Sequence, residues 1–294
     1  MVNNIAHSRQ EKGLIVNLAT TGVMPNRQLS PHVPLTHSQI VDDVAASLEL
    51  GVQIVHLHTR NDDESHCSDP EPYGRLIESI RALFGGDEVV IVVSTSGRIV
   101  SSFEARSRVL ELDGAMKPDM ASLTLSSLNF QQSASINEPD TVRSLAQCMQ
   151  EKAIKPELEI FDLGMLNFAQ MLLKEGLLSD TVYANLLLGN IASAQAELLH
   201  AGTLLSGIPH DWFVSIAGIG RSQLTANTLG VLFADGVRVG LEDNHWYDKA
   251  RNITATNTQL VERLVRLSTE LERPIAKRSE VRQWLGLSNA FEQH

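Results

Sequence analysis

The residues best suited to chemistry in this sequence are His56 and His58, which end a short apolar run. In a β-strand, residues i and i+2 point to the same face, so these imidazoles would lie side by side. Two imidazoles and one carboxylate make an open catalytic zinc site. Glu242 ends another apolar run and supplies the carboxylate. We therefore predict one divalent metal, zinc by ligand type, on these three side chains. The alternative is a histidine pair that only faces solvent or hydrogen-bonds to loop backbone.

Arg238 and Asp243 flank the predicted carboxylate ligand. Arg238 lies four residues before Glu242 and would share its face of a strand, and Asp243 begins the next loop. An arginine lowers the pKa of a nearby carboxyl and burial raises it, so the pair can act as a base with its orienting partner. A structural ion pair explains the same spacing, and spacing alone leaves both interpretations open.

Three other stretches carry weaker signals. Gly218-Ile219-Gly220-Arg221 follows one strand-like run and opens a helical pattern, which suits a phosphate but also suits a tight turn. Ser94-Thr95-Ser96-Gly97 follows another run and can hold a carboxylate or form an ordinary polar turn. Ser122 and Thr124 lie at the end of a third run. All three are candidate substrate contacts.

The elements that must position these residues alternate between apolar runs and longer helical patterns, about eight times. Apolar residues at i, i+4 and i+8, such as Ile40, Val44 and Leu48, indicate a helix that begins after Thr36 and ends near Gly51. The expected strands are 14–20, 52–58, 89–94, 120–125, 158–161, 182–188, 212–217 and 237–241. The expected helices are 37–50, 71–84, 102–112, 139–151, 164–174, 191–205, 222–233 and 255–271, with an extra turn at 280–285.

Eight strand–helix units in 294 residues are typical of a closed, parallel (β/α)₈ (TIM) barrel. The competing architecture is an open, doubly wound sheet, which usually carries a glycine-rich fingerprint after its first strand. The first run here ends in Thr20-Thr21-Gly22, which is no such fingerprint. We therefore expect a short lead-in (1–13) and one barrel domain (14–294). In a barrel, strands two and eight both flank strand one, so the three predicted ligands would meet at one mouth.

Composition excludes several partners and compartments. The formal net charge of −11 repels phosphate backbones, so we expect no nucleic acid partner. No apolar run is long enough to span a membrane, and residues 1–13 lack the apolar core of a signal peptide. Cys67 and Cys148 form no disulfide framework or metal-ligand motif, which fits a reducing cytoplasm.

The chain resembles the beta-keto acid cleavage enzymes over about residues 14–287. Many separate motifs in the same order carry this resemblance. They are Ala19-Thr20-Thr21-Gly22, Ser30-Pro31-His32-Val33-Pro34, Val55-His56-Leu57-His58-Thr59-Arg60, Ser94-Thr95-Ser96-Gly97, Lys117-Pro118-Asp119-Met120-Ala121-Ser122-Leu123, Leu128-Asn129-Phe130, Lys155-Pro156-Glu157-Leu158-Glu159, Ala217-Gly218-Ile219-Gly220-Arg221 and Val237-Arg238-Val239-Gly240-Leu241-Glu242-Asp243-Asn244.

The resemblance implies a zinc-dependent (β/α)₈ barrel, commonly a homotetramer, that uses acetyl-CoA as co-substrate. It implies a Claisen-type exchange, in which a 3-keto acid and acetyl-CoA give acetoacetate and a new acyl-CoA. The family's zinc ligands fall on His56, His58 and Glu242. The metal would bind the keto oxygen and stabilise enolate charge.

The resemblance also assigns roles around the metal. Asp243, oriented by Arg238, matches the base that deprotonates the substrate. Ser94, Gly97 and Ser122 match positions that hold the substrate carboxylate and its keto end.

The substrate side departs from the best-known family member, which acts on 3-keto-5-aminohexanoate. That enzyme uses a glutamate after the first strand to bind the substrate ammonium, and Met24 stands there in this chain. Ser122 replaces a threonine and keeps the hydroxyl, and Thr124 replaces an asparagine. A thioether cannot pair with a cation, so we expect a substrate without a 5-amino group and with a neutral or apolar tail.

Two other functions remain as alternatives. A CoA-independent metal-dependent aldolase or hydrolase on the same barrel would use the same metal ligands but turn over without acetyl-CoA. A barrel that has lost catalysis would only bind its ligand. Dependence on acetyl-CoA separates these from the cleavage enzyme.

Overall fold

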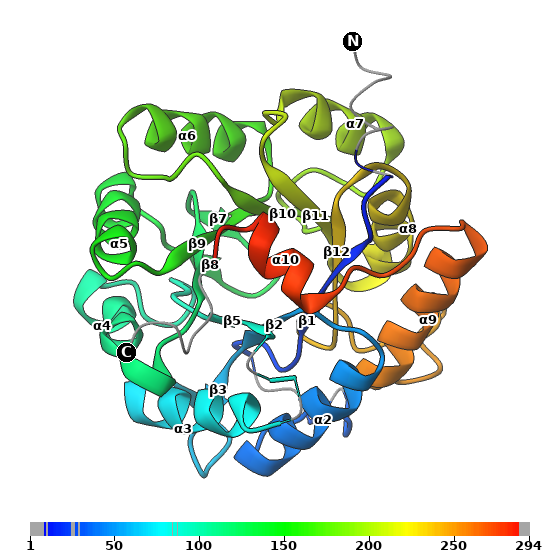
Figure 1. The fold of residues 1–294 in the computed structure, drawn as a ribbon, viewed down its shortest axis with the longest axis horizontal. Coiled ribbons are helices and arrows are strands. Elements are labelled where there is room, and N and C mark those ends of the chain that lie inside the picture. Colours follow the sequence, from blue (N-terminus) through cyan, green and yellow to red (C-terminus); the bar gives the residue numbers. More distant parts are fainter. Residues whose placement is uncertain are drawn as a thin grey trace.

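Eight parallel strands close into a barrel that helices surround (Figure 1). The computed structural model describes Arg9 and residues 11–24, 27–28, 30–83, 85–86 and 88–287. The barrel strands are β1 (Ile15–Ala19), β2 (Ile54–Leu57), β5 (Val90–Val93), β6 (Met120–Thr124), β9 (Lys155–Ile160), β10 (Tyr183–Leu188), β11 (Phe213–Gly218) and β12 (Gly236–Val239). Their order around the ring is β1-β12-β11-β10-β9-β6-β5-β2. The predicted (β/α)₈ barrel is confirmed, and the open sheet is excluded.

The register of β1 with its two neighbours brings the candidate site together. Asn17 of β1 pairs with Arg238 of β12, and Ala19 pairs with His56 of β2. Successive strand side chains alternate between faces, so His56 points into the barrel while Val55 and Leu57 pack in the outer core. His56 and Arg238 therefore approach each other across β1.

Two apolar layers leave only one end of the barrel open. An outer layer lies between the strands and the surrounding helices. An inner layer fills the lower barrel, where Ile15, Ile54 and Val92 pack with Val281 and Leu285. Val281 belongs to α10 (Arg278–Trp284), and Leu285 directly follows this helix, which lies across the amino-terminal end of the strands in Figure 1. This helix is the extra turn expected at 280–285.

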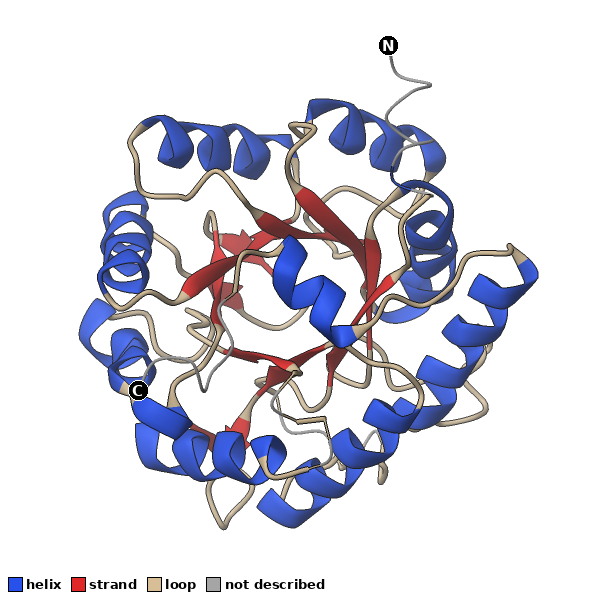
Figure 2. Cartoon of the chain, in the orientation of Figure 1, coloured by secondary structure: helices blue, strands red, loops and turns tan. Residues whose placement is uncertain are grey.

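The surrounding helices begin and end largely where the periodicity predicted. Thr36 caps the helix that follows it, and its hydroxyl accepts from the N–H of Gln39 in a complete capping box. Figure 2 shows these helices as an outer ring around the strands. They are α2 (His37–Glu49), α3 (Pro70–Arg81), α4 (Phe103–Ser107), α5 (Pro139–Glu151), α6 (Leu163–Lys174), α7 (Leu198–Gly207), α8 (Gln223–Phe233) and α9 (Asn257–Glu270).

Two predicted helices differ from the structure. The helix expected over 191–205 begins only at Leu198, because the preceding segment forms a loop in which the N–H of Gly189 donates to the carbonyl of Ala194. The helix expected over 102–112 is α-helical only to Ser107 and continues as a 3₁₀ turn over Arg108–Glu111. Phe84, the expected end of the helix over 71–84, lies outside the described residues, as does most of the expected lead-in.

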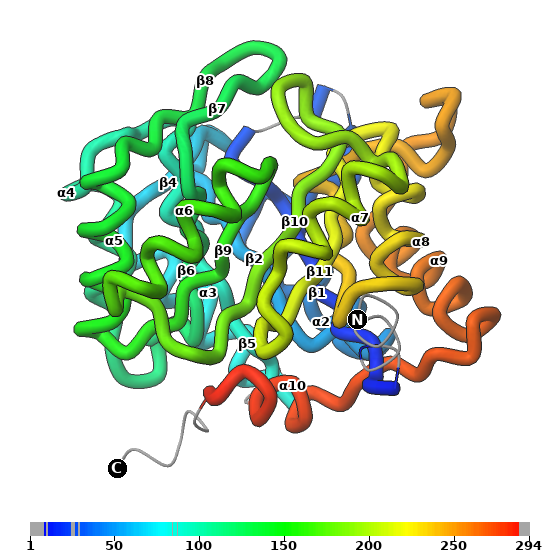
Figure 3. Tube along the Cα trace, turned by 90° about the horizontal axis from the view of Figure 1, so that it is seen from above, coloured from blue at the N-terminus to red at the C-terminus, as the bar shows by residue number. Residues whose placement is uncertain are grey.

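Two small hairpins, absent from the prediction, stand beyond the carboxyl ends of the strands. They are β3 (Thr59–Arg60) with β4 (His66–Cys67), and β7 (Leu128–Asn129) with β8 (Ala134–Ser135). In Figure 3 the β7–β8 hairpin lies at the end of the barrel opposite α10. No described helix has the length and apolar character needed to cross a membrane.

Candidate active site

The three side chains predicted as metal ligands meet at the open end of the barrel. The Nε2 of His58 lies 3.4 Å from Oε1 of Glu242, and the Nε2 of His56 lies 3.8 Å from Oε2 of Glu242. One ligand atom from each residue lies within 4.8 Å of the other two. Gly22 makes room for this carboxylate, because a Cβ there would stand 2.9 Å from Cγ of Glu242. The geometry therefore brings two nitrogens and one oxygen to one point.

The contacts of these three residues test whether they fit a metal. Among the described residues, Oε2 of Glu242, on the side of the two Nε2 atoms, is buried and has no hydrogen-bond partner. A buried polar atom without a partner costs about 1–3 kcal/mol, so such atoms usually indicate an absent ligand or water. An N, N, O donor set is the pattern of a catalytic zinc site with an open position. The residues present therefore fit one divalent ion.

The imidazole of His56 is held from behind by a carboxylate that the ligand prediction did not include. Its Nδ1 lies 2.7 Å from Oε2 of Glu157, which is fully buried on β9. The other oxygen of Glu157 accepts from the amides of Asn17, at 2.7 Å, and Asn185, at 2.8 Å. Such a carboxylate–histidine pair fixes the tautomer, so the Nε2 lone pair of His56 faces the Glu242 side.

A second acidic group shares His56 but does not suit a metal. His56, Glu157 and Glu159 also place ligand atoms within 4.8 Å of one another. Both oxygens of Glu157 already accept hydrogen bonds, and Oε2 of Glu159 accepts from the hydroxyl of Thr124 at 2.6 Å. These carboxylates therefore support the site through hydrogen bonds.

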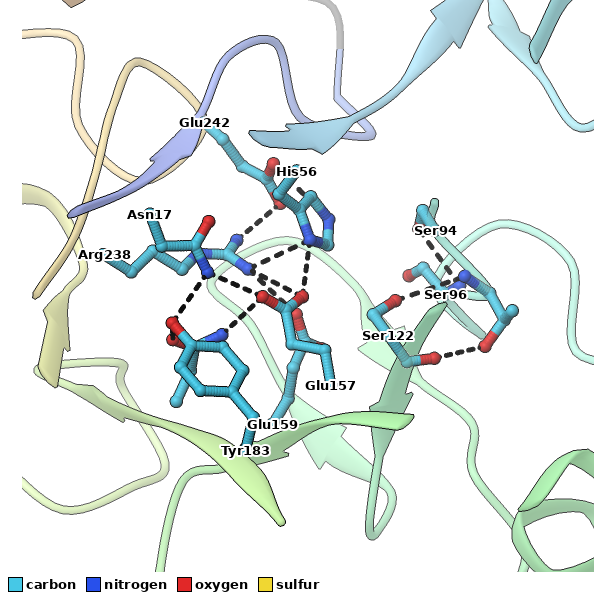
Figure 4. Close-up of polar contacts among 12 residues, drawn as sticks. Asn17, His56, Ser94, Ser96, Ser122, Glu157, Glu159, Tyr183, Arg238 and Glu242 are labelled. Atoms are coloured by element: carbon cyan, nitrogen blue, oxygen red, sulfur yellow. Dashed lines mark hydrogen bonds and ion pairs between the residues drawn. The ribbon is translucent and has the colours of Figure 1, made fainter. Parts of the chain in front are cut away.

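Arg238 joins the candidate metal ligands to the rest of the barrel mouth (Figure 4). Its guanidinium lies 2.9 Å from Glu242, 3.1 Å from Asp243 and 3.3 Å from Glu159. Burial opposes its charge, but these carboxylates outweigh burial and raise the pKa of Arg238 well above its usual value. The side chain is thus a permanent cation between three acids.

Glu242 and Asp243, which follow the end of β12, have pKa values shifted in opposite directions. Burial alone would raise the pKa of Glu242, but Arg238, His56 and His58 hold it well below its usual range. Burial dominates at Asp243 and, despite Arg238, raises its pKa to about 6. One carboxylate stays charged, as a metal ligand must, and the other can exchange a proton near neutral pH.

The predicted substrate contacts lie in two places beside this network. Ser94 begins the loop after β5, and its Oγ accepts from the N–H of Ser96 at 3.2 Å. Ser122 of β6 accepts from the N–H of Thr95 at 3.2 Å, so these hydroxyls form a layer next to the metal-ligand group in Figure 4. Thr124 belongs to the acidic network instead, through its hydrogen bond to Glu159.

Gly97 and Met24 lie in the loops that follow β5 and β1. A Cβ on Gly97 would stand 2.2 Å from the carbonyl of Ile136, which directly follows the β7–β8 hairpin. Packing at this point therefore already requires glycine. Met24 follows β1 and is 36% exposed. Arg60 lies beside that segment, and its guanidinium donates to the carbonyls of Gly22 and Val23.

The glycines of the predicted phosphate loop also have structural explanations. A Cβ on Gly218 would stand 2.5 Å from Cα of Gln223, so this glycine lets β11 pack against α8. Gly220 adopts a left-handed φ of +57°, and its N–H donates to the carbonyl of Asp243 at 2.7 Å. These backbone groups therefore form no free anion cradle.

Sequence reasoning missed the acidic residues of β9. The expected strand began at Leu158, whereas the structure starts it at Lys155 and turns both Glu157 and Glu159 toward the site. The alternation of glutamate with apolar residues over 157–160 was the signal for an inward-facing pair. Pro156 concealed it, because proline in a strand interior usually argues against a strand.

The fold and this site define a class, a (β/α)₈ barrel with a candidate metal centre beside a buried arginine–acid network. The sequence model of the beta-keto acid cleavage enzymes matches residues 13–287. The chain therefore belongs to the beta-keto acid cleavage enzyme family, and the resemblance seen in the motifs is confirmed.

Individual relatives agree with this assignment. The 3-oxoadipate:acetyl-CoA acetyltransferase of Cupriavidus necator is 37% identical over 277 residues, covering 93% of this chain and 94% of the relative. A 3-keto-5-aminohexanoate cleavage enzyme of Fusobacterium nucleatum is 34% identical over 275 residues, covering 93% and 98%. A solved complex of ObcA with oxaloacetate matches with a TM-score of 0.74 over 88% of this chain and 68% of that one, at 19% identity, which supports the fold alone.

Proposed function

We propose that this enzyme exchanges a 3-keto acid and acetyl-CoA for acetoacetate and a new acyl-CoA, with one divalent metal at its centre. The observation that carries the proposal is the triad of His56, His58 and Glu242, with the unpartnered buried Oε2 of Glu242, beside Arg238 and Asp243. Membership of the family supplies the reaction class. The relatives named for acetyl-CoA transfer support the co-substrate.

The triad would hold the metal, and zinc suits its mixed nitrogen and oxygen donors. When bound, such an ion acts as a Lewis acid that polarises a carbonyl oxygen. Glu157 keeps the lone pair of His56 directed to this position, and Arg238 keeps Glu242 ionised. These residues therefore preorganise the ligands before the ion arrives.

Asp243 is the proposed base, and Arg238 is its positioning residue. Asp243 takes a proton from C2 of the 3-keto acid, and C2 then attacks the acetyl carbonyl while the CoA thiolate leaves. The thiolate attacks the original keto carbon, and the bond from that carbon to C2 breaks. C2 recovers its proton from Asp243, which leaves acetoacetate and an acyl-CoA and returns the base to its starting state. The guanidinium of Arg238, 3.1 Å away, holds the carboxyl in place through both transfers.

The substrate carboxylate would lie against the loop after β5. Ser94 and Ser122 supply hydroxyls there, and Gly97 keeps side-chain bulk out of the loop. Thr124 would act indirectly, because its hydroxyl is already donated to Glu159. We therefore place the substrate between this hydroxyl layer and the metal-ligand triad.

The tail of the substrate is proposed to carry no ammonium. Met24 offers no negative charge, and Arg98, in the loop after β5, adds a positive one. Arg98 lies over the ring of Phe130 at 4.1 Å and donates to Ser133. Among the described residues no carboxylate lies within ion-pair distance of this guanidinium. A neutral tail, or one that ends in a carboxylate, fits this surrounding.

Incubation with zinc, acetyl-CoA and a panel of 3-keto acids tests the proposal. The panel needs an acidic tail (3-oxoadipate), a neutral tail (3-oxohexanoate) and an ammonium tail (3-keto-5-aminohexanoate), with acetoacetate and acyl-CoA measured by mass spectrometry. We expect both products in equal amounts, and least with the ammonium tail. Turnover that needs no acetyl-CoA would instead support an aldolase or hydrolase, and ligand binding without turnover would support a binding protein.

We also propose a cytoplasmic homo-oligomer, with residues 1–13 as a lead-in to one catalytic domain over 14–294. Cys67 and Cys148 are free, which suits a reducing compartment. Ile191, Leu198 and Leu199 are 66%, 68% and 76% exposed, which suits burial against another copy. Mass photometry at nanomolar concentration distinguishes a tetramer, as the resemblance implies, from a monomer.

A further inference from the structure

A basic hollow opens beside the active site, between the loops that follow β11 and β12. Gly220 and Arg221 line it from one loop, and Trp246, Lys249 and Arg251 line it from the other. The second loop runs directly from the carboxyl end of β12, where Asp243 lies, to α9. In Figure 3 the segment ahead of α9 stands at the end of the barrel opposite α10, as does the β7–β8 hairpin. The hollow therefore faces the side from which substrates enter.

The cations of this hollow have no acidic partners. No carboxylate of the described residues forms an ion pair with Arg221, Lys249, Arg251 or Arg263. Elsewhere the exposed arginines and lysines often do pair, as Arg75 does with Glu71 and Lys152 with Glu111. The chain has a net charge of −11, so these four unpaired cations form a positively charged area on a protein that is negatively charged as a whole. Such a group attracts a polyanion.

Asp248 is the acidic residue among the described residues that line the hollow, and its carboxylate accepts hydrogen bonds from its own loop. Oδ1 of Asp248 accepts from the N–H groups of Asn252 and Ile253 at 3.0 and 2.8 Å. A β-bridge between Trp246 and Thr254 closes the same loop. The loop is thus built to present Lys249 and Arg251, because its backbone is fixed by its own hydrogen bonds.

Two aromatic side chains line the hollow next to the cations. Trp246 and Tyr247 both contribute to its wall. The guanidinium of Arg263 covers the ring of Tyr247 at 4.4 Å and donates to the Tyr247 carbonyl at 2.6 Å. Purine bases stack on aromatic rings and on arginine planes. The wall therefore offers a base a stacking surface beside positive charge.

The hollow and the reaction site share backbone. Asn244, which lines the hollow, follows Asp243 directly, and its side-chain amide donates to the carbonyl of Trp246 at 2.6 Å. The N–H of Gly220, on the opposite wall, donates to the carbonyl of Asp243. A ligand with its anionic end in the hollow and a long flexible arm can therefore reach the proposed base.

We propose that this hollow binds the nucleotide of acetyl-CoA, with its phosphates on Arg221, Lys249 and Arg251 and its adenine against Trp246. The inference rests on the proposed function only in naming acetyl-CoA as the source of the nucleotide. The nucleotide of acetyl-CoA would then lie away from the metal site, and only the pantetheine arm would enter the barrel.

The test uses the double variant Lys249→Ala/Arg251→Ala, since both side chains are exposed and the fold does not depend on them. The matched control is Arg75→Ala/Lys174→Ala, which removes the same charge from exposed positions on α3 and α6. Calorimetry with adenosine 3′,5′-bisphosphate measures the nucleotide site without catalysis. Steady-state kinetics then compares acetyl-CoA with acetyl-pantetheine, which carries the same reactive thioester without the nucleotide.

We expect the double variant to bind the bisphosphate at least about tenfold more weakly than wild type, from the loss of two charge-assisted contacts. Its KM for acetyl-CoA should rise by a similar factor with kcat unchanged, and its KM for acetyl-pantetheine should not move. Equal weakening in the control variant, or an unaltered KM for acetyl-CoA, would overturn the assignment and leave the proposed reaction standing. A third outcome separates the two proposals. If the double variant loses bisphosphate binding but the wild-type enzyme transfers nothing from acetyl-CoA, the nucleotide site stands and the proposed reaction is rejected.

Discussion

Replacing Glu157 by glutamine changes one atom of a fully buried side chain and tests how the proposed metal ligand His56 is held. Glu157 presents two acceptor oxygens to three donors: Asn17 and Asn185 on Oε1, and His56 on Oε2. Glutamine has one oxygen and one NH₂ group, so one side must face a donor. If the NH₂ group faces the two asparagines, two amide donors lose their acceptor. If it faces His56, only the imidazole donor loses its acceptor. At about 1–3 kcal/mol per unsatisfied buried donor, the second orientation wins.

That orientation has a consequence for metal binding. An NH₂ group that faces Nδ1 of His56 stabilises the tautomer with its proton on Nε2, the nitrogen on the Glu242 side. A protonated Nε2 offers no lone pair to a metal. Loss of such a supporting carboxylate typically costs about 10–100-fold in metal affinity, or about 1.4–2.8 kcal/mol.

Competition with a chromogenic chelator measures zinc affinity in Glu157→Gln, with circular dichroism to confirm the fold. Glu175→Gln is the matched control, since it makes the same chemical change in an exposed pair with Arg143. We expect normal zinc affinity in the control and a weakening within the stated range in Glu157→Gln. A folded Glu157→Gln protein that binds zinc as tightly as wild type would refute the role given to Glu157.

Three further predictions concern the base, the substrate tail and stability. Asp243→Asn should retain stoichiometric metal by elemental analysis and lose about 10²–10⁴-fold in kcat, because an amide cannot take the C2 proton; an unchanged kcat with the metal retained would contradict this. Arg98→Ala should lower kcat/KM for 3-oxoadipate about tenfold or more relative to 3-oxohexanoate, since a charged hydrogen bond contributes about 1.5–3 kcal/mol; an equal effect on both substrates would remove Arg98 from tail recognition. Burial raises the pKa of Asp43 from 3.8 to about 6, so its ionisation destabilises the folded state increasingly as pH rises from about 4 through 6. Asp43→Asn keeps an acceptor for Asn257 and should raise the thermal midpoint at pH 7.5, by about 1–2 kcal/mol of unfolding free energy after solvent screening, but not at pH 4.

The barrel and the convergence of His56, His58 and Glu242 were predictable because each depends on local patterns. Strands buried on both sides read as continuous apolar runs, and two histidines at an i, i+2 spacing must share a face. The position of Glu242 followed from closure, since β12 and β2 both pair with β1. The strand pattern, the histidine spacing and the closure of the barrel together predict where these side chains meet.

The missed features depend on contacts that no local pattern encodes. The start of β9 at Lys155 is set by pairing with β6, where Met120 lies opposite Lys155 and Ala121 opposite Pro156. The segment over 191–197 has a helix-like composition but is held as a loop by hydrogen bonds to residues such as Phe161. The hairpin strands are two residues long, too short to show a period.

The fate of one carbon atom shows whether the enzyme carries out a Claisen-type exchange with acetyl-CoA. Wild-type enzyme with zinc, 3-oxoadipate and acetyl-CoA labelled with ¹³C at the acetyl carbonyl is followed by ¹³C nuclear magnetic resonance. We expect label at the keto carbon, C3, of acetoacetate, formed in equal amount with unlabelled acyl-CoA. Label that appears only in acetate, or acetoacetate that forms without label, would contradict it.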